Sequence, residues 1–158
     1  MVVVRDLFLR RAIELAVENA RSGVGGPFGA VIVRDGRIVA EGVNLVTSIP
    51  DPTAHAEITA IREACRTVGS FHLPGCEIYA SCEPCPMCLG AIYWARLDRV
   101  FFAASRSDAA QAGFSDQMIY EELTVPAGSR HVPMQQLLRE EALAAFREWS
   151  GRADRIDY

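Results

Sequence analysis

The sequence predicts an α/β fold in which a mixed β-sheet carries helices on both faces. Segments of helical and strand character alternate in the order α-β-β-α-β-α-β before a closing helix, and this order favours a sheet covered on both sides. A chain of 158 residues, half of them hydrophobic, is long enough to bury a core without disulfides. We therefore expect a single domain over residues 1–158, with residues 151–158 as a C-terminal tail.

The first half of the chain is expected to form a helix, a hairpin and a second helix. The elements span residues 6–22 (helix), 28–33 and 37–43 (strands) and 53–68 (helix). The Asp35-Gly36 pair between the two strands is typical of a hairpin turn. Thr53 can cap the second helix, which would carry His55 and Glu57 near its N-terminus.

The second half is expected to alternate strand and helix. The elements span residues 76–81 (strand), 86–95 (helix), 99–103 (a buried strand) and 135–149 (a closing helix). Pro86 suits the first turn of its helix, where a missing N–H is not needed. The segment 105–124 is rich in small residues, and we expect it to be mostly loop or short helix.

Composition excludes several classes of function. The net charge is −4, and all 16 basic residues are arginine, so lysine Schiff-base and P-loop chemistry are ruled out. An acidic balance is unfavourable for a nucleic-acid-binding surface. No stretch approaches the ~20 apolar residues of a membrane span. Five cysteines, an odd number, suggest metal or core residues in a reducing compartment, so we expect a cytoplasmic protein.

Two short stretches carry metal-binding chemistry: His55-Ala56-Glu57, and the segment from Cys82 to Cys88. Imidazole and thiolate are ligands that zinc favours, and three protein ligands leave a fourth position open for water. Spacing alone does not choose between the pairs Cys82/Cys85 and Cys85/Cys88. A closed structural site of His55 with all three cysteines is the alternative, and it would leave Glu57 without a role.

Glu57 is the candidate proton carrier. Hydrolysis of an aromatic amine needs a nucleophile at neutral pH, and zinc can lower the pKa of water from about 15.7 to about 7. It also needs a group that moves protons to the ring nitrogen and the leaving amine. Alone, Glu57 would be interpreted as a favourable acid in the first turn of a helix; beside a metal site we interpret it as the shuttle.

The combined motif His-x-Glu and Pro-Cys-x-x-Cys, at His55, Glu57, Pro84, Cys85 and Cys88, resembles that of the cytidine-deaminase-like zinc hydrolases. From about Leu7 to Tyr158 the chain looks most like the short bacterial guanine deaminases, through the stretches GGPFGAVIV, DPTAHAE, SCEPCPMCLGAIYWAR and DAAQAGF and the terminal Tyr158.

The resemblance implies a three-layer α/β/α sandwich around a mixed five-stranded sheet. The residues themselves indicate four clear strands. A fifth strand would lie near residues 118–125 or 130–134, unless that part of the chain is helical.

The resemblance also implies an activity and its residues. The reaction would be hydrolysis of guanine to xanthine and ammonia, with one Zn²⁺ per chain held by His55, Cys85 and Cys88. Glu57 and Asp116 would be catalytic. The implied substrate contacts are Phe28, Asn44, His55, Ala56, Trp94 and Tyr158.

Each of the substrate contacts also has a plainer interpretation. Phe28 and Trp94 are typical of packing residues, Asn44 of the start of a loop, and Asp116 of a solvated acid. Asn44 carries both a hydrogen-bond donor and an acceptor, so it can recognise the edge of a purine. Ser115 stands before Asp116 where related sequences often have a second acid.

The tail from Gly151 to Tyr158 would be a frayed end on its own sequence. In the guanine deaminases that the chain resembles, the C-terminal segment crosses to the partner subunit and its final tyrosine closes the active site. We therefore expect a homodimer with exchanged C-terminal segments. Its substrate would be a small purine, with neither nucleic acid nor membrane as a partner.

Other functions stay open at this point. Guanosine deamination is one of them, since related sequences share these motifs and a ribose needs only an open channel. Cytosine deamination and tRNA adenosine deamination are further alternatives within the same zinc chemistry, and the acidic charge balance weighs against RNA. The non-enzymatic alternative is a protein in which the zinc ion has a structural role.

Overall fold

The computed structural model describes residues 4–158, and it divides at Asp116 into two compact units. The first unit ends at Asp116 and the second spans Gln117–Tyr158. The first contains α1 (Val4–Ser22), β1 (Gly29–Arg34), β2 (Arg37–Val43), α2 (Ala56–Val68), β3 (Cys76–Cys82), α3 (Pro86–Trp94), β4 (Arg99–Ala104) and α4 (Arg106–Gln111). The second contains α5 (Gln117–Thr124), a 3-10 turn (Ala127–Ser129) and α6 (Arg139–Gly151).

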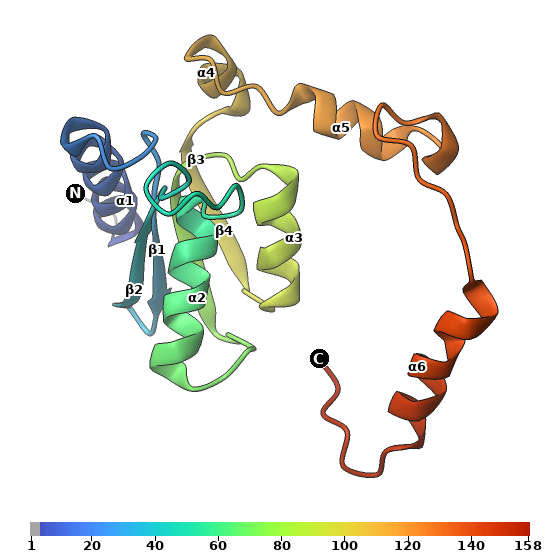
Figure 1. Cartoon of the computed structure of the whole chain (residues 1–158). Helices are drawn as coiled ribbons and strands as arrows, with labels where there is room; N and C mark the ends of the chain where they lie inside the picture. Colours follow the sequence, from blue (N-terminus) through green and yellow to red (C-terminus); the bar gives the residue numbers. More distant parts are fainter. Residues whose placement is uncertain (1–3) are drawn as a thin grey trace. The chain divides into compact units, whose positions relative to one another are not determined.

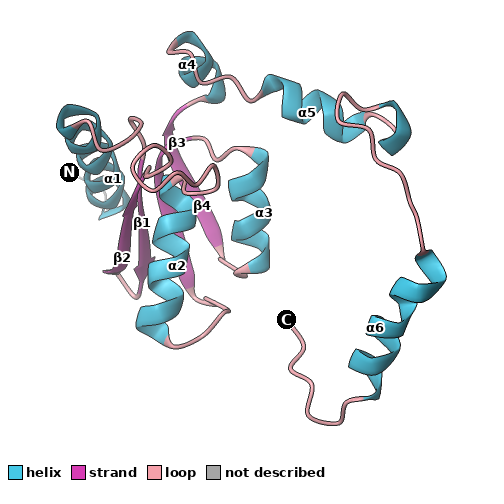
Figure 2. Ribbon diagram, in the orientation of Figure 1, coloured by secondary structure: helices cyan, strands magenta, loops and turns pink. Residues whose placement is uncertain are grey.

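The sheet lies in the first unit and has the strand order β2-β1-β3-β4. Strand β1 pairs antiparallel with β2 and with β3, whereas β3 and β4 are parallel. This is the mixed sheet that the order of elements predicts (Figure 2). The first hairpin turns at Asp35 and Gly36, whose φ angles of 51° and 72° are both positive, as a type I′ turn requires.

The expectation of five strands is wrong, because the described residues form a sheet of four. Residues 117–124 form helix α5 instead. Ile119 and Leu123 are four residues apart, which is a helical spacing. Pro133 lies within the other candidate segment, and a proline has no N–H to give to a strand ladder.

Helices cover both faces of the sheet, as Figure 1 shows: α1 lies on one side and α2 and α3 on the other. The larger core cluster joins Ile32 and Ile78 from the sheet to Ala60 and Ile61 of α2 and Ile92 of α3. A smaller cluster on the opposite face is formed by Leu15, Val31, Val33 and Tyr79. The three-layer α/β/α arrangement is thus confirmed, and alternate residues of β1 and β3 serve different faces, as a period of two requires.

Two local predictions fail. Helix α2 begins at Ala56 with His55 as its N-cap, because the Thr53 hydroxyl instead donates to the carboxylate of Asp51 at 2.6 Å. Strand β4 is not buried: it is an edge of the sheet, and 46% of the surface of Phe102 is exposed.

The second unit is built differently from the first. Helices α5 and α6 contain no buried residue, and α6 starts four residues later than the sequence pattern suggests. Helix α6 exposes large apolar side chains, among them Phe146 and Trp149. None of the described helices combines the length and the apolar character that crossing a bilayer demands.

A candidate zinc site with a buried carboxylate

Two helix N-termini hold the metal-binding motif. His55 is the N-cap residue of α2, Cys85 is the N-cap residue of α3, and Cys88 lies in the first turn of α3. Pro86 occupies the start of α3, as the sequence predicts. Both helices begin near the end of the sheet at which β3 terminates (Figure 1). A helix N-terminus stabilises negative charge, so this location favours thiolates.

The spacing of the donor atoms fits a tetrahedral zinc ion. His55 Nδ1 lies 3.6 Å from Cys85 Sγ and 3.5 Å from Cys88 Sγ, and the three ligand atoms all lie within 4.8 Å of one another. Zn–N and Zn–S bonds of about 2.0 and 2.3 Å that meet at a tetrahedral angle place nitrogen and sulfur about 3.5 Å apart. The three side chains therefore already have the separations that a zinc ion would impose.

The protonation chemistry of the two thiols also fits a divalent cation. The pKa of Cys85 is lowered to about 4, first by a hydrogen bond from Cys88 and further by His55. The pKa of Cys88 is raised, first by the same hydrogen bond and then by burial. Two adjacent thiolates repel each other, which favours a proton on one of the two sulfurs. A Zn²⁺ ion would replace that proton and stabilise both thiolates.

Glu57 lies two residues beyond His55 and is buried, with 7% of its surface exposed. Burial raises the pKa of its carboxyl group, since removal from water disfavours the charged form. A raised pKa favours the protonated form of the carboxyl group, which is the form that a general acid needs. Glu57 does not belong to the three-residue cluster of metal-binding side chains.

Cys82 does not join that cluster. It is the last residue of β3 and its thiol donates to the backbone oxygen of Ser105 at 3.6 Å. Burial raises the pKa of this thiol to about 11. It has the properties of a small core residue and not of a thiolate ligand.

Asn44 and Ala56 are both buried beside the start of α2. The side-chain oxygen of Asn44 accepts hydrogen bonds from the backbone N–H groups of Gly26 and Val46, each at 3.3 Å. An amide oxygen has two lone pairs, so its acceptor capacity is used within the protein. Its NH₂ group is therefore the part of the amide that remains to be offered, and the role of Asn44 as a substrate contact stays a prediction.

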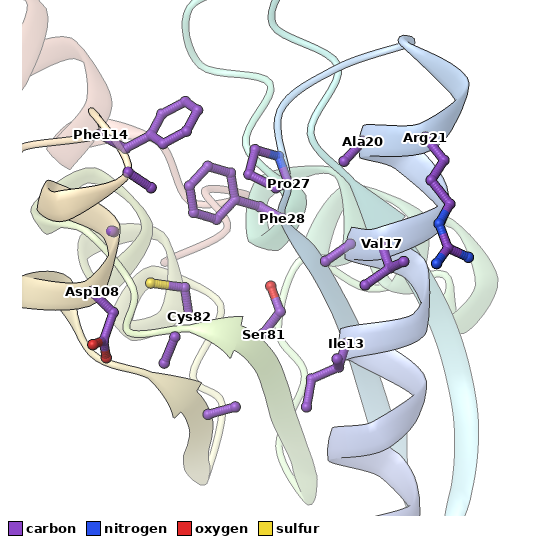
Figure 3. Close-up of a pocket in the computed structure, with 15 residues that line it drawn as sticks. Ile13, Val17, Ala20, Arg21, Pro27, Phe28, Ser81, Cys82, Asp108 and Phe114 are labelled. Carbon is purple, nitrogen blue, oxygen red and sulfur yellow. The ribbon is translucent and has the colours of Figure 1, made fainter.

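Phe28 lies at the mouth of an apolar groove of about 510 Å³ in the first unit. Its ring meets that of Phe114 edge-on, with centroids 5.0 Å apart, and Figure 3 shows both rings at the rim of the groove. Side chains of α1, including Ile13 and Val17, form the opposite wall, while Ser81 and Cys82 lie at its base. The groove lining does not include the three candidate zinc ligands or Glu57.

The remaining predicted contacts are less enclosed. Trp94 ends α3 with 68% of its surface exposed, and Asp116 is half-buried. Tyr158 belongs to the second unit, is 70% exposed, and approaches Trp149 with ring centroids 6.4 Å apart. These residues are thus not brought together within one unit.

Two residues around the site were not singled out from the sequence. Phe114 is the partner of Phe28 described above. Asn19 is buried near the end of α1, and its side chain contacts the backbone of Gly26 and Asn44. The available signal was its position: Ala12, Leu15, Ala16 and Asn19 share one helical face, and a polar residue there is unusual.

The α/β/α fold, the three-ligand cluster and the buried carboxylate together define a zinc-dependent hydrolase site. Residues 4–104 match the family model described as the cytidine and deoxycytidylate deaminase zinc-binding region. The chain belongs to this family.

Known relatives share more than this region. A guanine deaminase of Bacillus subtilis is 55% identical over 97% of this chain and 98% of its own. The crystal structure of guanine deaminase from Bacillus subtilis superimposes with a TM-score of 0.95 and the same coverage. A structure of guanine deaminase from Nitrosomonas europaea is 30% identical, with a TM-score of 0.66 over 89% of this chain and 81% of that one. A tRNA-specific adenosine deaminase of Aquifex aeolicus is 42% identical over 63% of this chain and 66% of its own.

Proposed function

We propose that this protein hydrolyses guanine to xanthine and ammonia. The observation that carries the proposal is the buried carboxyl group of Glu57 next to the cluster of His55, Cys85 and Cys88. This pairing of a proton carrier with a zinc site occurs in a chain that is similar over almost its whole length to a guanine deaminase. The similarity supports guanine as the substrate, and the site supports the hydrolytic chemistry.

Zinc and Glu57 divide the chemistry of the reaction. A zinc ion held by His55, Cys85 and Cys88 would supply a Lewis acid that activates water as the nucleophile. Glu57 accepts a proton from the attacking water and delivers it to a ring nitrogen of the base. It then takes the second proton from the hydroxyl group that the attack has placed on the purine carbon and passes it to the amine, which leaves as ammonia while the C=O of xanthine forms, so one carboxyl group serves as base and as acid. The raised pKa of Glu57 supports its role as the acid.

In this proposal the base is held by the predicted substrate contacts. The NH₂ group of Asn44 donates to an acceptor on the edge of the purine. The backbone of Ala56, one residue from His55, offers its polar groups to the same base. Phe28 forms an apolar wall against the planar ring, with Phe114 behind it. His55 and Trp94 add further contact surface. Asp116 assists proton movement and accepts from donors on the guanine ring.

The active form in this proposal is a homodimer with exchanged C-terminal segments. The first unit has an apolar groove, and the second has helices with no buried residue and with exposed apolar side chains such as Phe146. Exchange between two chains would cover both surfaces, and Tyr158 would close the zinc site of the partner. We assign the enzyme to purine breakdown in the cytoplasm, consistent with five free cysteines.

Deamination of tRNA adenosine is the second candidate, because several tRNA-specific adenosine deaminases are similar to parts of this chain. The net charge of −4 disfavours it, since an RNA partner requires clustered cations. Guanosine is a third candidate substrate, differing from guanine only by the ribose.

Ammonia release from a panel of substrates separates these candidates. The zinc-loaded protein is incubated with guanine, guanosine, cytosine, adenine and a tRNA substrate under the same conditions. We expect the highest kcat/KM with guanine. Faster release from cytosine or from tRNA would refute the proposed substrate class, and release from guanosine alone would replace the free base by the nucleoside.

A further inference from the structure

One buried side chain, that of Asn19, joins three elements. It connects the end of α1 to the turn at Gly25 and Gly26 (the glycine turn) and to the residue that follows β2. Asn19 Nδ2 donates to the backbone oxygen of Gly26 at 2.8 Å and to the backbone oxygen of Asn44 at 2.8 Å. Asn19 is 5% exposed. An amide NH₂ group has two hydrogens, so both are used in these contacts.

The turn fits closely against Asn44. A Cβ atom at Gly25 would lie 1.9 Å from the backbone oxygen of Asn44, so only glycine permits this approach. Gly26 lies against the Asn44 side chain, since a Cβ there would meet Asn44 Oδ1 at 3.5 Å. The backbone then passes to Phe28, whose oxygen accepts from Asn44 N at 3.2 Å.

The same contacts decide which way the Asn44 amide faces. Two backbone N–H groups, from Gly26 and Val46, point at one atom of that amide. That atom must be the oxygen, because an NH₂ group cannot accept from either donor. Within the part of the chain that the structure describes, no acceptor is in hydrogen-bonding contact with Asn44 Nδ2. Its NH₂ group is thus left to donate to a ligand.

We propose that Asn19 is a positioning residue for substrate recognition, which fixes the glycine turn so that Asn44 is presented as a hydrogen-bond donor only. The consequence for specificity is that the substrate edge facing Asn44 must carry an acceptor. A purine carbonyl or an unprotonated ring nitrogen meets this condition, whereas an exocyclic amine does not. This inference rests on the proposed function for the identity of the base, but not for the orientation of Asn44.

Asn19 can fix the turn because the carbonyl oxygens of Gly26 and Asn44 would cost free energy if they were buried without hydrogen-bond donors. Asn19→Asp preserves size and shape but replaces the NH₂ group by oxygen, which repels both carbonyls at neutral pH. The turn then separates from Asn44, and the amide of Asn44 becomes free to rotate. Ser22→Ala is the matched control, because the Ser22 hydroxyl donates to the Asn19 backbone oxygen and accepts from Val24 N–H, whereas the two hydrogen bonds to the Gly26 and Asn44 oxygens come from Asn19.

The first measurement does not depend on activity. Backbone amide hydrogen exchange is recorded in wild type, Asn19→Asp and Ser22→Ala, with the amides of Ile78 and Ala80 in β3 as internal references. We expect exchange at Gly26 and Val46 to accelerate about tenfold in Asn19→Asp only, with the references unchanged. If Asn19→Asp does not fold, Asn19→Ala is used instead. Unchanged exchange at Gly26 and Val46 overturns the proposal whatever the substrate is.

The second measurement is a double-mutant cycle with guanine, using Asn19→Asp, Asn44→Ala and both together. We expect Asn19→Asp to raise KM about tenfold with a smaller effect on kcat. In the Asn44→Ala background the same substitution should raise KM by less than about twofold. An equal effect of Asn19→Asp with and without Asn44 would contradict positioning through Asn44. If the wild-type protein does not deaminate guanine, the proposed function is refuted instead. The hydrogen-exchange measurement alone then decides the role of Asn19.

Discussion

His55 Nδ1 lies 3.5 Å from Cys88 Sγ, although the two residues are 33 positions apart in the chain. The contact exists because the N-termini of α2 and α3 meet at one end of the sheet. A third ligand, Cys85, lies 3.6 Å from the same imidazole nitrogen. The zinc site is therefore a property of two packed helices and not of one loop.

Metal content should separate Cys85 from Cys82. We expect Cys85→Ala to lose most of its zinc, because only one thiolate would remain beside His55. Cys82→Ala should retain about one zinc per chain, since the Cys82 thiol donates to Ser105 and stands outside the cluster. Metal analysis of both purified variants is the check. Zinc lost from Cys82→Ala and kept by Cys85→Ala would show that the ligand assignment is wrong.

Close packing of α2 on β2 predicts a steric effect at Gly42. A Cβ atom there would lie 2.3 Å from the oxygen of Ala56 and 2.4 Å from the nitrogen of Ala60. Gly42→Ala should lower the free energy of unfolding by roughly 1–3 kcal/mol, the usual range for overpacking, and should displace the start of α2.

Gly90→Ala is the control for this substitution. Gly90 is inside α3 and a Cβ there would meet nothing within 4 Å, so the change should stabilise the helix by roughly 0.5–1 kcal/mol. Denaturant unfolding of both variants provides the comparison. A Gly42→Ala protein as stable as wild type would mean that α2 and β2 are farther apart than the structure has them.

The ion pair between α1 and β2 predicts a dependence of stability on pH. Arg11 donates to both carboxylate oxygens of Glu41, each at 2.8 Å. Hydrogen bonding by Arg11 holds the pKa of Glu41 below its ordinary value. A lowered folded-state pKa contributes stability above the unfolded-state pKa of about 4.3, and this is lost as the pH falls through the folded-state value.

Glu41→Gln should therefore be less stable than wild type at pH 7 by only about 0.5 kcal/mol, because about a third of each side chain is exposed. The difference should vanish in acid below the folded-state pKa. Unfolding curves at pH 7 and in acid measure it, with Glu63→Gln in an exposed helical pair as the control. A difference that grows as the pH falls would have the wrong sign for this ion pair.

The sequence predicts those parts of the molecule whose signals are local. The hairpin at Asp35-Gly36 and the Pro86 helix start depend on neighbouring residues, and the motif of His55, Glu57, Cys85 and Cys88 is a pattern of short spacings. Sequence spacing did not decide between Cys82 and Cys88, because both lie three residues from Cys85. The choice follows from packing, which directs the Cys82 thiol to Ser105.

Features that depend on competition between distant or alternative partners were not predictable. Thr53 was expected to cap α2, but its hydroxyl donates to Asp51. The fifth strand was expected from the resemblance alone, and helix α5 takes its place. The role of Asn19 needed the three-dimensional contact with Gly26 and Asn44, which a helical pattern does not reveal.

The C-terminal tail provides a test of subunit exchange. Deletion of residues 156–158 should leave a folded, zinc-loaded protein with strongly reduced guanine turnover, because the proposed lid, Tyr158, is removed. Mixing this deletion with an intact-tail Glu57→Gln chain should restore part of the activity. One hybrid site then combines a working Glu57 with a Tyr158 from the partner.

Verified subunit exchange is the control for that mixture. Two outcomes would contradict the exchanged tail: full turnover by the deletion variant alone, or no recovery of activity in mixed dimers that have exchanged subunits. In either case the tail is a frayed end.

The central claim is that Glu57 moves the protons in a zinc-dependent deamination of guanine, and the most direct measurement is xanthine formation by Glu57→Gln. The glutamine preserves size but cannot carry the proton. We expect the variant to fold, to bind one zinc per chain as wild type does, and to lose about 10²–10⁴-fold in kcat. Zinc-loaded Glu57→Gln that converts guanine within a few-fold of the wild-type rate would contradict the account.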